Sequence, residues 1–332
     1  TTNAKFAGTY VLDDHEITAG FEWQATEVFN LFVPGSQGVF EFDGLDNFRN
    51  QLAEEIEYKI PASLDPNDGA AAFTFKNQTL YIQDRYMMTD DLTVTFGLRW
   101  DTWTSGDTPV ANPNFEERYG FTNAVAPDMD LLQPRLGFNY NLDSDTFIYG
   151  GAGLFAGGNP NVWLSNNYSN NGVSILASSI ERDGANAAEL AALDGSNTAN
   201  FLLEVPGLSV SSLSGGDGAV NALDKNFDVP SIWKYNLGTQ HTLDNGVLLG
   251  LDIIYSKYKD SAKTIALNAV GAGTAPDGRP IYTDFDKLDA DCATGGDISR
   301  CGRSTTDYFL TNGEENGDAT VISTFATKRW DM

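Results

Sequence analysis

Closely spaced acidic side chains make one segment of this sequence a candidate metal site. Asp284, Asp286, Asp289 and Asp291 follow one another in a Gly- and Asp-rich stretch, and Asp297 lies just beyond them. Ca²⁺ takes roughly six to eight oxygen ligands, which clustered carboxylates can supply. The spacing is not that of an EF-hand loop, so a solvated acidic loop is the alternative. Calcium is the one cofactor that the sequence suggests.

Two cysteines, Cys292 and Cys301, lie in the same stretch. Cysteines of proteins in oxidising compartments usually pair, so we predict a local disulfide, with two free thiols as the alternative. The histidines are His15 and His241, and no Cys/His spacing of the zinc-binding kind is present. A zinc site is therefore not expected.

Motifs for enzymatic chemistry are missing from the sequence. The glycine-rich residues 150–158 lack both the Gly-Lys-Ser/Thr ending of a P-loop and the spacing of a dinucleotide fingerprint. We instead expect a bent, closely packed strand there. No G-x-S-x-G nucleophile motif occurs. Because the chain has 46 acidic residues, pairs of carboxylates occur by chance and indicate nothing. We expect a protein that is not an enzyme.

The composition narrows the class of protein further. The chain has 332 residues and a net charge of -26, which repels phosphate backbones and argues against nucleic-acid binding. Hydrophobic residues make up 41% of the chain, yet no run of about 18 apolar residues exists to form a transmembrane helix. A transmembrane β-barrel is not excluded by this, because its strands are only half apolar.

The elements that position these side chains are long strands with strict alternation. Residues 74–103 predict two strands joined by a short acidic turn at 89–91, and in the second strand apolar and polar residues alternate. Side chains of a strand point to opposite faces in turn, so one face meets an apolar medium and the other a polar one. Strands at 133–142 and 247–255 show the same alternation. The apolar set comprises Leu92, Val94, Phe96, Leu98, Trp100, Leu136, Phe138, Leu249, Leu251 and Ile253.

Short turns and long loops alternate between the predicted strands. Long loops are expected at about 33–71, 105–131, 156–228 and 260–319, and turns of about three residues join the strands of each hairpin. Long structureless loops count against a compact soluble domain. They are expected in an outer-membrane barrel, whose periplasmic turns are short and whose extracellular loops are long. Within the first loop, Phe48, Leu52 and Ile56 recur at a helical period and predict a short helix.

Three segments resemble the β-barrel of TonB-dependent outer-membrane receptors, and most of all their Oar-like branch. These segments are YIQDRYMMTDDLTVTFGLRWD, LQPRLGFNYNLDSDTFIYGGAGLFAGGNPNVW and PSIWKYNLGTQHTLDNGVLLGLDIIY. The family barrel has about 22 strands and a plugged lumen. Energised by TonB, such receptors import scarce ligands, for example siderophores, cobalamin, glycans or peptides, across the outer membrane of Gram-negative bacteria. The resemblance implies the same location for this chain.

The resemblance also sets the expected architecture and partners. We expect residues 1–332 to form one partial barrel domain without a plug domain, an all-β antiparallel up-and-down meander of about nine long strands. The apolar set would face lipid, and Arg99, Arg135 and Lys234 would face the lumen. The expected partners are outer-membrane lipid and lipopolysaccharide, the remainder of the barrel with its plug or partner chains, and TonB only through the missing plug. Nucleic acid is not an expected partner.

The loop that contains Trp163 and Tyr168 would lie outside the cell. Its aromatic and Asn-rich character suits either binding of sugars or peptides, or packing on a neighbouring loop. Two functions stay open at this point. One is uptake of a large or scarce ligand by a receptor barrel. The other is a surface adhesion or matrix-interaction role.

Overall fold

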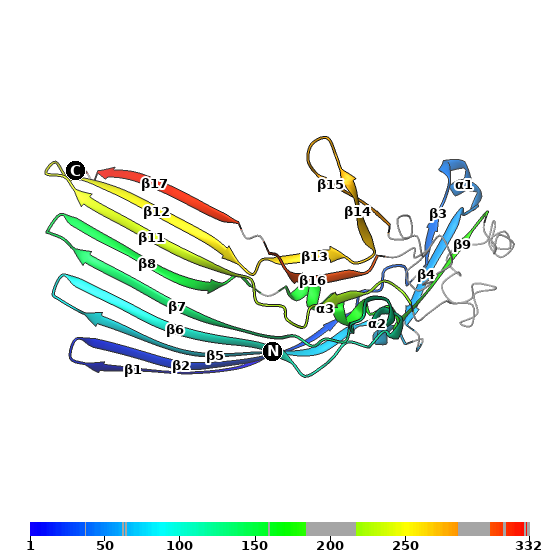
Figure 1. Cartoon of the computed structure of the whole chain (residues 1–332), viewed down its shortest axis with the longest axis horizontal. Helices are drawn as coiled ribbons and strands as arrows, with labels where there is room; N and C mark the ends of the chain where they lie inside the picture. Colours follow the sequence, from blue (N-terminus) through cyan, green and yellow to red (C-terminus); the bar gives the residue numbers. More distant parts are fainter. Residues whose placement is uncertain are drawn as a thin grey trace.

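The largest sheet described in the computed structural model is antiparallel and has nine strands (Figure 1). The structure describes residues 1–36, 38–61, 63, 65–158, 160–183, 217–284, 306–314, 317–328 and 330. Sequence neighbours pair along the whole sheet, which confirms the predicted all-β antiparallel meander of nine strands. In spatial order the strands are β1 (Thr2–Leu12), β2 (His15–Asn30), β5 (Ala71–Met87), β6 (Leu92–Ser105), β7 (Asp128–Asn141), β8 (Thr146–Ala156), β11 (Ser231–Thr242), β12 (Val247–Lys259) and β17 (Asp318–Lys328).

The short hairpin turns all lie at one edge of the sheet, here called the turn end (Figure 1, left). Local side-chain to backbone hydrogen bonds shape them. The Asp145 N–H donates to Asp143 Oδ1 over 2.9 Å, and this contact holds the pKa of the Asp143 carboxyl below its usual range. Between β11 and β12, Gly246 has φ +77°, a left-handed conformation that glycine adopts without a steric penalty. These turns match the acidic and Asn-Gly segments of the sequence.

The strand register sorts the side chains into two faces, as the alternation predicts. Leu98 lies opposite Ile82 and Pro134, and Trp100 lies opposite Leu80 and Leu132. This outer face leaves a broad set of apolar side chains exposed, including Phe96, Leu98, Trp100, Leu136, Leu249, Leu251 and Ile253. Leu92, Val94 and Phe138 belong to the same rows and are partly exposed. The opposite, inner face carries the polar side chains.

Near the turn end, a polar pair lies in the outer rows. Asp84 lies between Ile17 and Phe96 in register, and its Oδ2 is 2.7 Å from Nδ1 of His15. The His15 ring stacks on Tyr86 with centroids 4.3 Å apart. A histidine–carboxylate contact and aromatic rings at the end of an apolar band suit an interface between an apolar medium and water.

Strand β8 fits closely between its neighbours. A Cβ atom added to Gly151 would lie 2.6 Å from the backbone oxygen of Leu136, and one added to Gly150 would lie 2.8 Å from that of Asn236. Real Cβ atoms do not approach backbone so closely, so both positions require glycine. The glycine-rich run therefore serves packing within the sheet.

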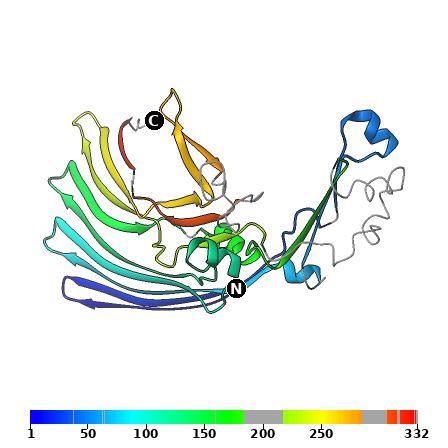
Figure 2. The same ribbon diagram turned by 45° about the vertical axis from the view of Figure 1, so that its right-hand side comes forward.

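The long connections contain more structure than the sequence predicts. They form two further three-stranded sheets, one hairpin and short helices at the end of the sheet opposite the turns, here called the loop end (Figures 1 and 2). Their elements are β3 (Val39–Glu41), α1 (Gly44–Asn50), β4 (Glu55–Pro61), a 3-10 helix (Pro66–Gly69), α2 (Pro113–Tyr119), α3 (Asn161–Ser169), β9 (Ile175–Glu181), β10 (Asn221–Leu223), β13 (Ala262–Ala266), β14 (Ala269–Thr274), β15 (Pro280–Asp284) and β16 (Tyr308–Asn312).

The helix predicted from Phe48, Leu52 and Ile56 is only partly correct. α1 includes Phe48 but ends at Asn50, because Gln51 takes a left-handed conformation (φ 57°) and its N–H bonds back to Phe48 O. Ile56 lies in β4, is buried, and is paired with Ile180 of β9. The apolar spacing thus arises from a helix followed by a strand, and pairing with a distant segment decides the conformation of the second half.

The main hydrophobic core lies where the loop elements cover the inner face. Phe73, Trp103, Met129 and Leu131 project from β5, β6 and β7 and pack beneath α3. The other buried members of this core are Ala71, Leu154, Leu164, Tyr168, Leu223, Phe227, Val229 and Leu310. The inner face is therefore apolar and capped at the loop end, and polar and uncovered by described residues toward the turns. No described helix is long and apolar enough to cross a membrane.

A buried arginine joins the loop elements to one another. Arg118 of α2 is 0% exposed, its Nη1 lies 2.6 Å from Asp217 Oδ1, and its Nη2 lies 3.4 Å from Asp307 Oδ2. Asp307 also accepts from the Tyr119 hydroxyl (2.9 Å) and from the Val220 N–H (3.1 Å). We call these five residues the Arg118 cluster. It ties three long connections together, because its members come from different loops.

Candidate functional site

A continuous set of polar side chains crosses the inner face of β1, β2, β5, β6 and β7. We call it the polar belt; it comprises Lys5, Glu22, Thr79, Arg99, Asp101, Gln133 and Arg135. Register brings these side chains together, because Glu22, Thr79 and Asp101 face one another across β2, β5 and β6. Arg99 in turn lies opposite Gln133 of β7.

Asp101 is the centre of the polar belt. The residue is 2% exposed, and Arg99 donates to both of its carboxylate oxygens, from Nε to Oδ2 over 2.7 Å and from Nη2 to Oδ1 over 2.8 Å. The Thr79 hydroxyl and the Gln133 amide also donate to the carboxylate. A bidentate arginine–carboxylate pair with further donors is a strong, directional contact. It fixes both charges in a single geometry.

The polar belt continues on either side of this pair. Glu22 lies 2.5 Å from Lys5 Nζ and 3.7 Å from Arg99 Nη1. On β7, Gln133 Oε1 accepts from Arg135 Nη2 over 3.2 Å. The Arg135 guanidinium also lies over the Phe155 ring, 4.6 Å from its centroid. Each acid of the belt is thus matched by a neighbouring cation.

The sequence prediction named some of these side chains and missed others. Arg99 and Arg135 lie on the inner face within the polar belt, and exposed Lys234 of β11 lies in the same register row as Arg135, with Gly153 between them. Glu22, Asp101 and Gln133 were not singled out as site residues. In the sequence, these residues are recognisable only as polar positions of alternating strands. Such a position can hold either a buried ion pair or a solvated side chain, and the alternation does not tell the two apart.

A second feature, here called the mouth hollow, lies on the inner face at the loop end. It has a volume of about 330 Å³ and is bounded by β2, β5, β6 and α3. Its lining combines amides and a hydroxyl with apolar and aromatic groups: Gln24, Thr26, Val28, Phe73, Phe75, Asn77, Trp103, Asn161 and Leu164. On β5 the nearest lining residue of the mouth hollow is Asn77, two residues before Thr79 of the polar belt and on the same face.

The two aromatic residues predicted for the third loop occur on α3 in packing contacts. Tyr168 is buried, its ring stacks on Phe73 with centroids 4.1 Å apart, and its hydroxyl donates to Asp107 O over 2.5 Å. Burial raises the pKa of the Tyr168 hydroxyl. Trp163 meets Tyr308 edge to face at 6.4 Å. Neither side chain lines the mouth hollow, whose α3 lining consists of Asn161 and Leu164.

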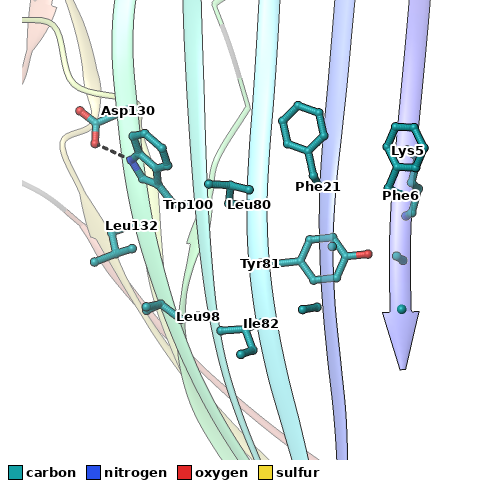
Figure 3. A pocket seen from close by; sticks show the side chains of 14 residues that line it. Lys5, Phe6, Phe21, Leu80, Tyr81, Ile82, Leu98, Trp100, Asp130 and Leu132 are labelled. Carbon is teal, nitrogen blue, oxygen red and sulfur yellow. Dashed lines mark hydrogen bonds between the residues drawn. The ribbon is translucent and has the colours of Figure 1, made fainter. Parts of the chain in front are cut away.

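A broad hollow also occurs on the outer face, and it is apolar (Figure 3). Phe6, Phe21, Leu80, Ile82, Leu98, Trp100 and Leu132 line it. At its rim the Trp100 indole N–H donates to Asp130 Oδ2 over 3.1 Å. Lys5 of the polar belt also borders this hollow, but most of its lining is apolar, so it suits contact with an apolar medium rather than with a polar ligand.

The predicted calcium and disulfide residues are not placed. Asp286, Asp289, Asp291, Cys292 and Cys301 lie outside the described residues. Asp284 ends β15, and its side chain is not described. Among the residues that the structure does describe, no group of three or more His, Cys, Asp or Glu side chains is arranged to bind a metal ion. Both sites stay predictions from the sequence.

A family model agrees with this architecture. The family model of the outer membrane beta barrel domain matches residues 2–298. No curated protein matches the chain. One similar solved structure is the ferric enterobactin receptor PfeA from Pseudomonas aeruginosa in complex with BCV-L6 (12% identity, TM-score 0.46, covering 97% of this chain and 32% of that one).

Two other similar structures are the siderophore receptor PirA from Acinetobacter baumannii and the copper transporter OprC. For PirA the identity is 14% and the TM-score 0.44, covering 98% of this chain and 33% of that one. For OprC the identity is 11% and the TM-score 0.46, covering 99% of this chain and 35% of that one. The chain thus spans about a third of the length of these proteins. Through the family model that matches most of its residues, the chain belongs to the outer membrane beta barrel domain family.

Proposed function

We propose that this chain forms part of the barrel of a TonB-dependent receptor, of the Oar-like branch, in the outer membrane of a Gram-negative bacterium. The receptor would take up a large or scarce ligand such as a siderophore, glycan or peptide in an energised step. The observation that carries the proposal is a single curved sheet with an exposed apolar outer face and the polar belt on its inner face. That arrangement suits a wall between lipid and a wet lumen.

The same geometry suggests the partners. The outer face would contact outer-membrane lipid and lipopolysaccharide. The polar belt would face a plug domain, through which TonB acts. In the described part of the chain β1 pairs only with β2 and β17 only with β12, so each leaves one edge open. Because unpaired backbone groups cost several kcal/mol each in lipid, the remainder of the barrel or partner chains would pair with these edges.

Energy-dependent accumulation tests the uptake function. Cells that make the full-length protein and cells that lack its gene would be given radiolabelled ferric enterobactin, neutral oligosaccharides and a tryptic peptide mixture, with and without a protonophore. We expect one class of probe to accumulate only in producing cells and only without protonophore. If accumulation of every probe is independent of the protein, the uptake function is wrong.

A surface adhesion role is the second candidate, and the hairpin β14–β15 favours it. This hairpin projects at the loop end (Figure 1) and exposes Ile281 (45%) and Tyr282 (64%). Apolar side chains that project into solvent are common at sites of protein contact. Adhesion predicts binding to cells or polymers that persists when the protonophore is present, whereas uptake stops.

A further inference from the structure

We propose that the mouth hollow is a ligand subsite for an uncharged, polyhydroxylated molecule, namely a terminal segment of an oligosaccharide. The inference rests on the proposed uptake function and specifies its substrate class. It depends on three properties of the mouth hollow: the type of its polar groups, the state of its aromatic wall, and the balance of charge around it.

The polar groups of the mouth hollow match sugar hydroxyls. Gln24, Asn77 and Asn161 each offer an amide that can donate and accept, and Thr26 offers a hydroxyl that does the same. Asn77 already donates to Thr102 O over 3.2 Å, which orients its amide. Gln24 and Asn161 are exposed, and within the described residues their side chains make no hydrogen bond to protein. These two amides are free to bind hydroxyl groups.

The aromatic wall is already packed before any ligand binds. Trp103 and Phe73 are buried members of the main core, and Phe75 packs against that core. The Tyr168 ring on the far side of Phe73 and buried Leu164 of α3 hold this wall in place. Ring faces carry partial negative charge, so they favour the C–H faces of sugar rings. A wall that needs no rearrangement costs little conformational entropy on binding.

Charge separates this ligand class from an anionic chelate. The residues that line the mouth hollow include no ionisable side chain. In the adjacent polar belt, Asp101 is paired with Arg99, and Glu22 with Lys5. An anionic ligand would need cations that are not already committed to carboxylates. Arg135 of the polar belt is such a cation, since it contacts Gln133 and the Phe155 ring, but it does not line the mouth hollow. The net charge of -26 on the whole chain also repels anions, so an uncharged ligand is favoured.

The size of the mouth hollow limits how much ligand it can contain. Its volume of about 330 Å³ lies at the lower end of small-molecule sites, which span roughly 300–1,000 Å³. We therefore infer that one end of an oligosaccharide binds here, while the rest lies outside the mouth hollow.

Binding measurements on the full-length receptor test this proposal. The protein would be purified from outer membranes in detergent and titrated with maltohexaose, cellohexaose, xylohexaose and chitohexaose, and separately with ferric enterobactin. Calorimetry gives the affinity. We expect at least one hexaose to bind. The substitutions Gln24→Ala and Asn77→Ala should each weaken it by roughly tenfold, as loss of one good hydrogen bond does.

Matched controls come from the same inner face. Gln83→Ala and Asn139→Ala remove the same amides from β5 and β7 at positions that do not line the mouth hollow, and they should leave the affinity unchanged. Because the Gln24 side chain makes no hydrogen bond to described protein groups, Gln24→Ala should fold normally, which heat-modifiability on gels checks.

The other possible outcomes distinguish the subsite proposal from the uptake function. The subsite proposal is overturned if no hexaose binds, if hexaose affinity is equal in wild type and Gln24→Ala, or if tryptic peptides displace the hexaose more strongly than sugars do. Energy-dependent accumulation of ferric enterobactin without hexaose binding would overturn the ligand class and leave the uptake function standing. Hexaose binding that depends on Gln24, without energy-dependent accumulation, would leave the ligand class standing and overturn uptake.

Discussion

Asp101 shows how a carboxylate can be buried in a sheet without a free charge. Its side chain receives hydrogen bonds from Arg99, Thr79 and Gln133, which come from three neighbouring strands. Burial of a charge is costly unless it is both paired and hydrogen-bonded, and here both conditions are met. The contact therefore joins β5, β6 and β7 through side chains as well as through the backbone.

Asp101→Asn tests the contribution of this contact. The substitution keeps the shape but removes the charge and forces an amide N–H₂ toward donors, so we expect the full-length barrel to lose about 1–3 kcal/mol of unfolding free energy. Urea unfolding followed by tryptophan fluorescence measures the change. Asp90→Asn, in the exposed β5–β6 turn, is the control and should change stability little. Equal effects of the two variants would contradict the role given to Asp101.

Tyr168 predicts a dependence of stability on alkaline pH. Burial raises the pKa of its hydroxyl in the folded protein, so the proton is bound more tightly when folded than when unfolded. The stabilisation is complete below the unfolded pKa of about 10 and is lost as the pH rises through the folded value. Unfolding midpoints between pH 8 and pH 11 measure it. Tyr168→Phe should remove this alkaline loss, and Tyr282→Phe, on an exposed side chain, should keep it.

At the scale of elements, the loops are joined by contacts that cannot be predicted from the sequence of any one loop. Helix α2 is capped at its start by Asn112, whose Oδ1 accepts from Phe115 N over 3.1 Å, and at its end by Gly120 with φ +75°. These caps define a short helix that would be marginal alone. The Arg118 cluster fixes α2 against the segments that contain Asp217 and Asp307. The loop elements thus pack into one layer and are not independent loops.

Arg118→Met tests that layer. The substitution leaves Asp307, which is 0% exposed, without its cation, and breaking a buried pair costs about 3–5 kcal/mol. Hydrogen bonds from Tyr119 and Val220 to Asp307 place our expectation at the lower end of that range. Amide hydrogen exchange should become faster in α2, β10 and β16 but not in β6.

The control for this prediction is Arg279→Met. Arg279 pairs with Asp277 in an exposed turn, where ion pairs contribute little. Faster exchange across the nine-stranded sheet in Arg118→Met would show that the loop layer and the sheet unfold together, contrary to this expectation.

At the scale of the whole molecule, the outer face determines where the protein can exist. Its apolar side chains form one exposed band that no described second sheet covers. Exposed apolar surface of this extent is a liability in water and an advantage in a bilayer, where such a band is about 25 Å tall. The polar belt on the other side of the same strands requires water or protein instead.

The substitution Leu136→Arg tests whether the outer face contacts lipid. Leu136 lies within the apolar band, 52% exposed, and arginine near the middle of a bilayer costs about 2–4 kcal/mol. Leu142→Arg, one residue beyond the turn end of the same strand, should cost only about 0–1 kcal/mol, because it lies near the interface. Guanidinium titrations of the full-length barrel refolded into lipid vesicles give both values. Equal costs would mean that the outer face does not meet lipid.

The sequence by itself determined the strands, their number in the main sheet, the short turns and the division into two faces. Strand alternation is a local property: each side chain points opposite to the next, so Leu98 and Arg99 are sorted to different faces whatever else the chain does. Turn chemistry at Asp143 and Gly246 is equally local. These features needed no knowledge of distant contacts.

Only the tertiary structure decided the conformation of the long loops, the burial of Arg118 and Asp101, and the position of the mouth hollow. Each depends on residues far apart in the chain, as when Ile56 of β4 pairs with Ile180 of β9, or when α3 covers Phe73. The free energy of such contacts comes from burial and pairing between segments, and it overrides local preference. For this reason the residues 48–56, whose apolar spacing is helical, form the end of a helix followed by the start of a strand.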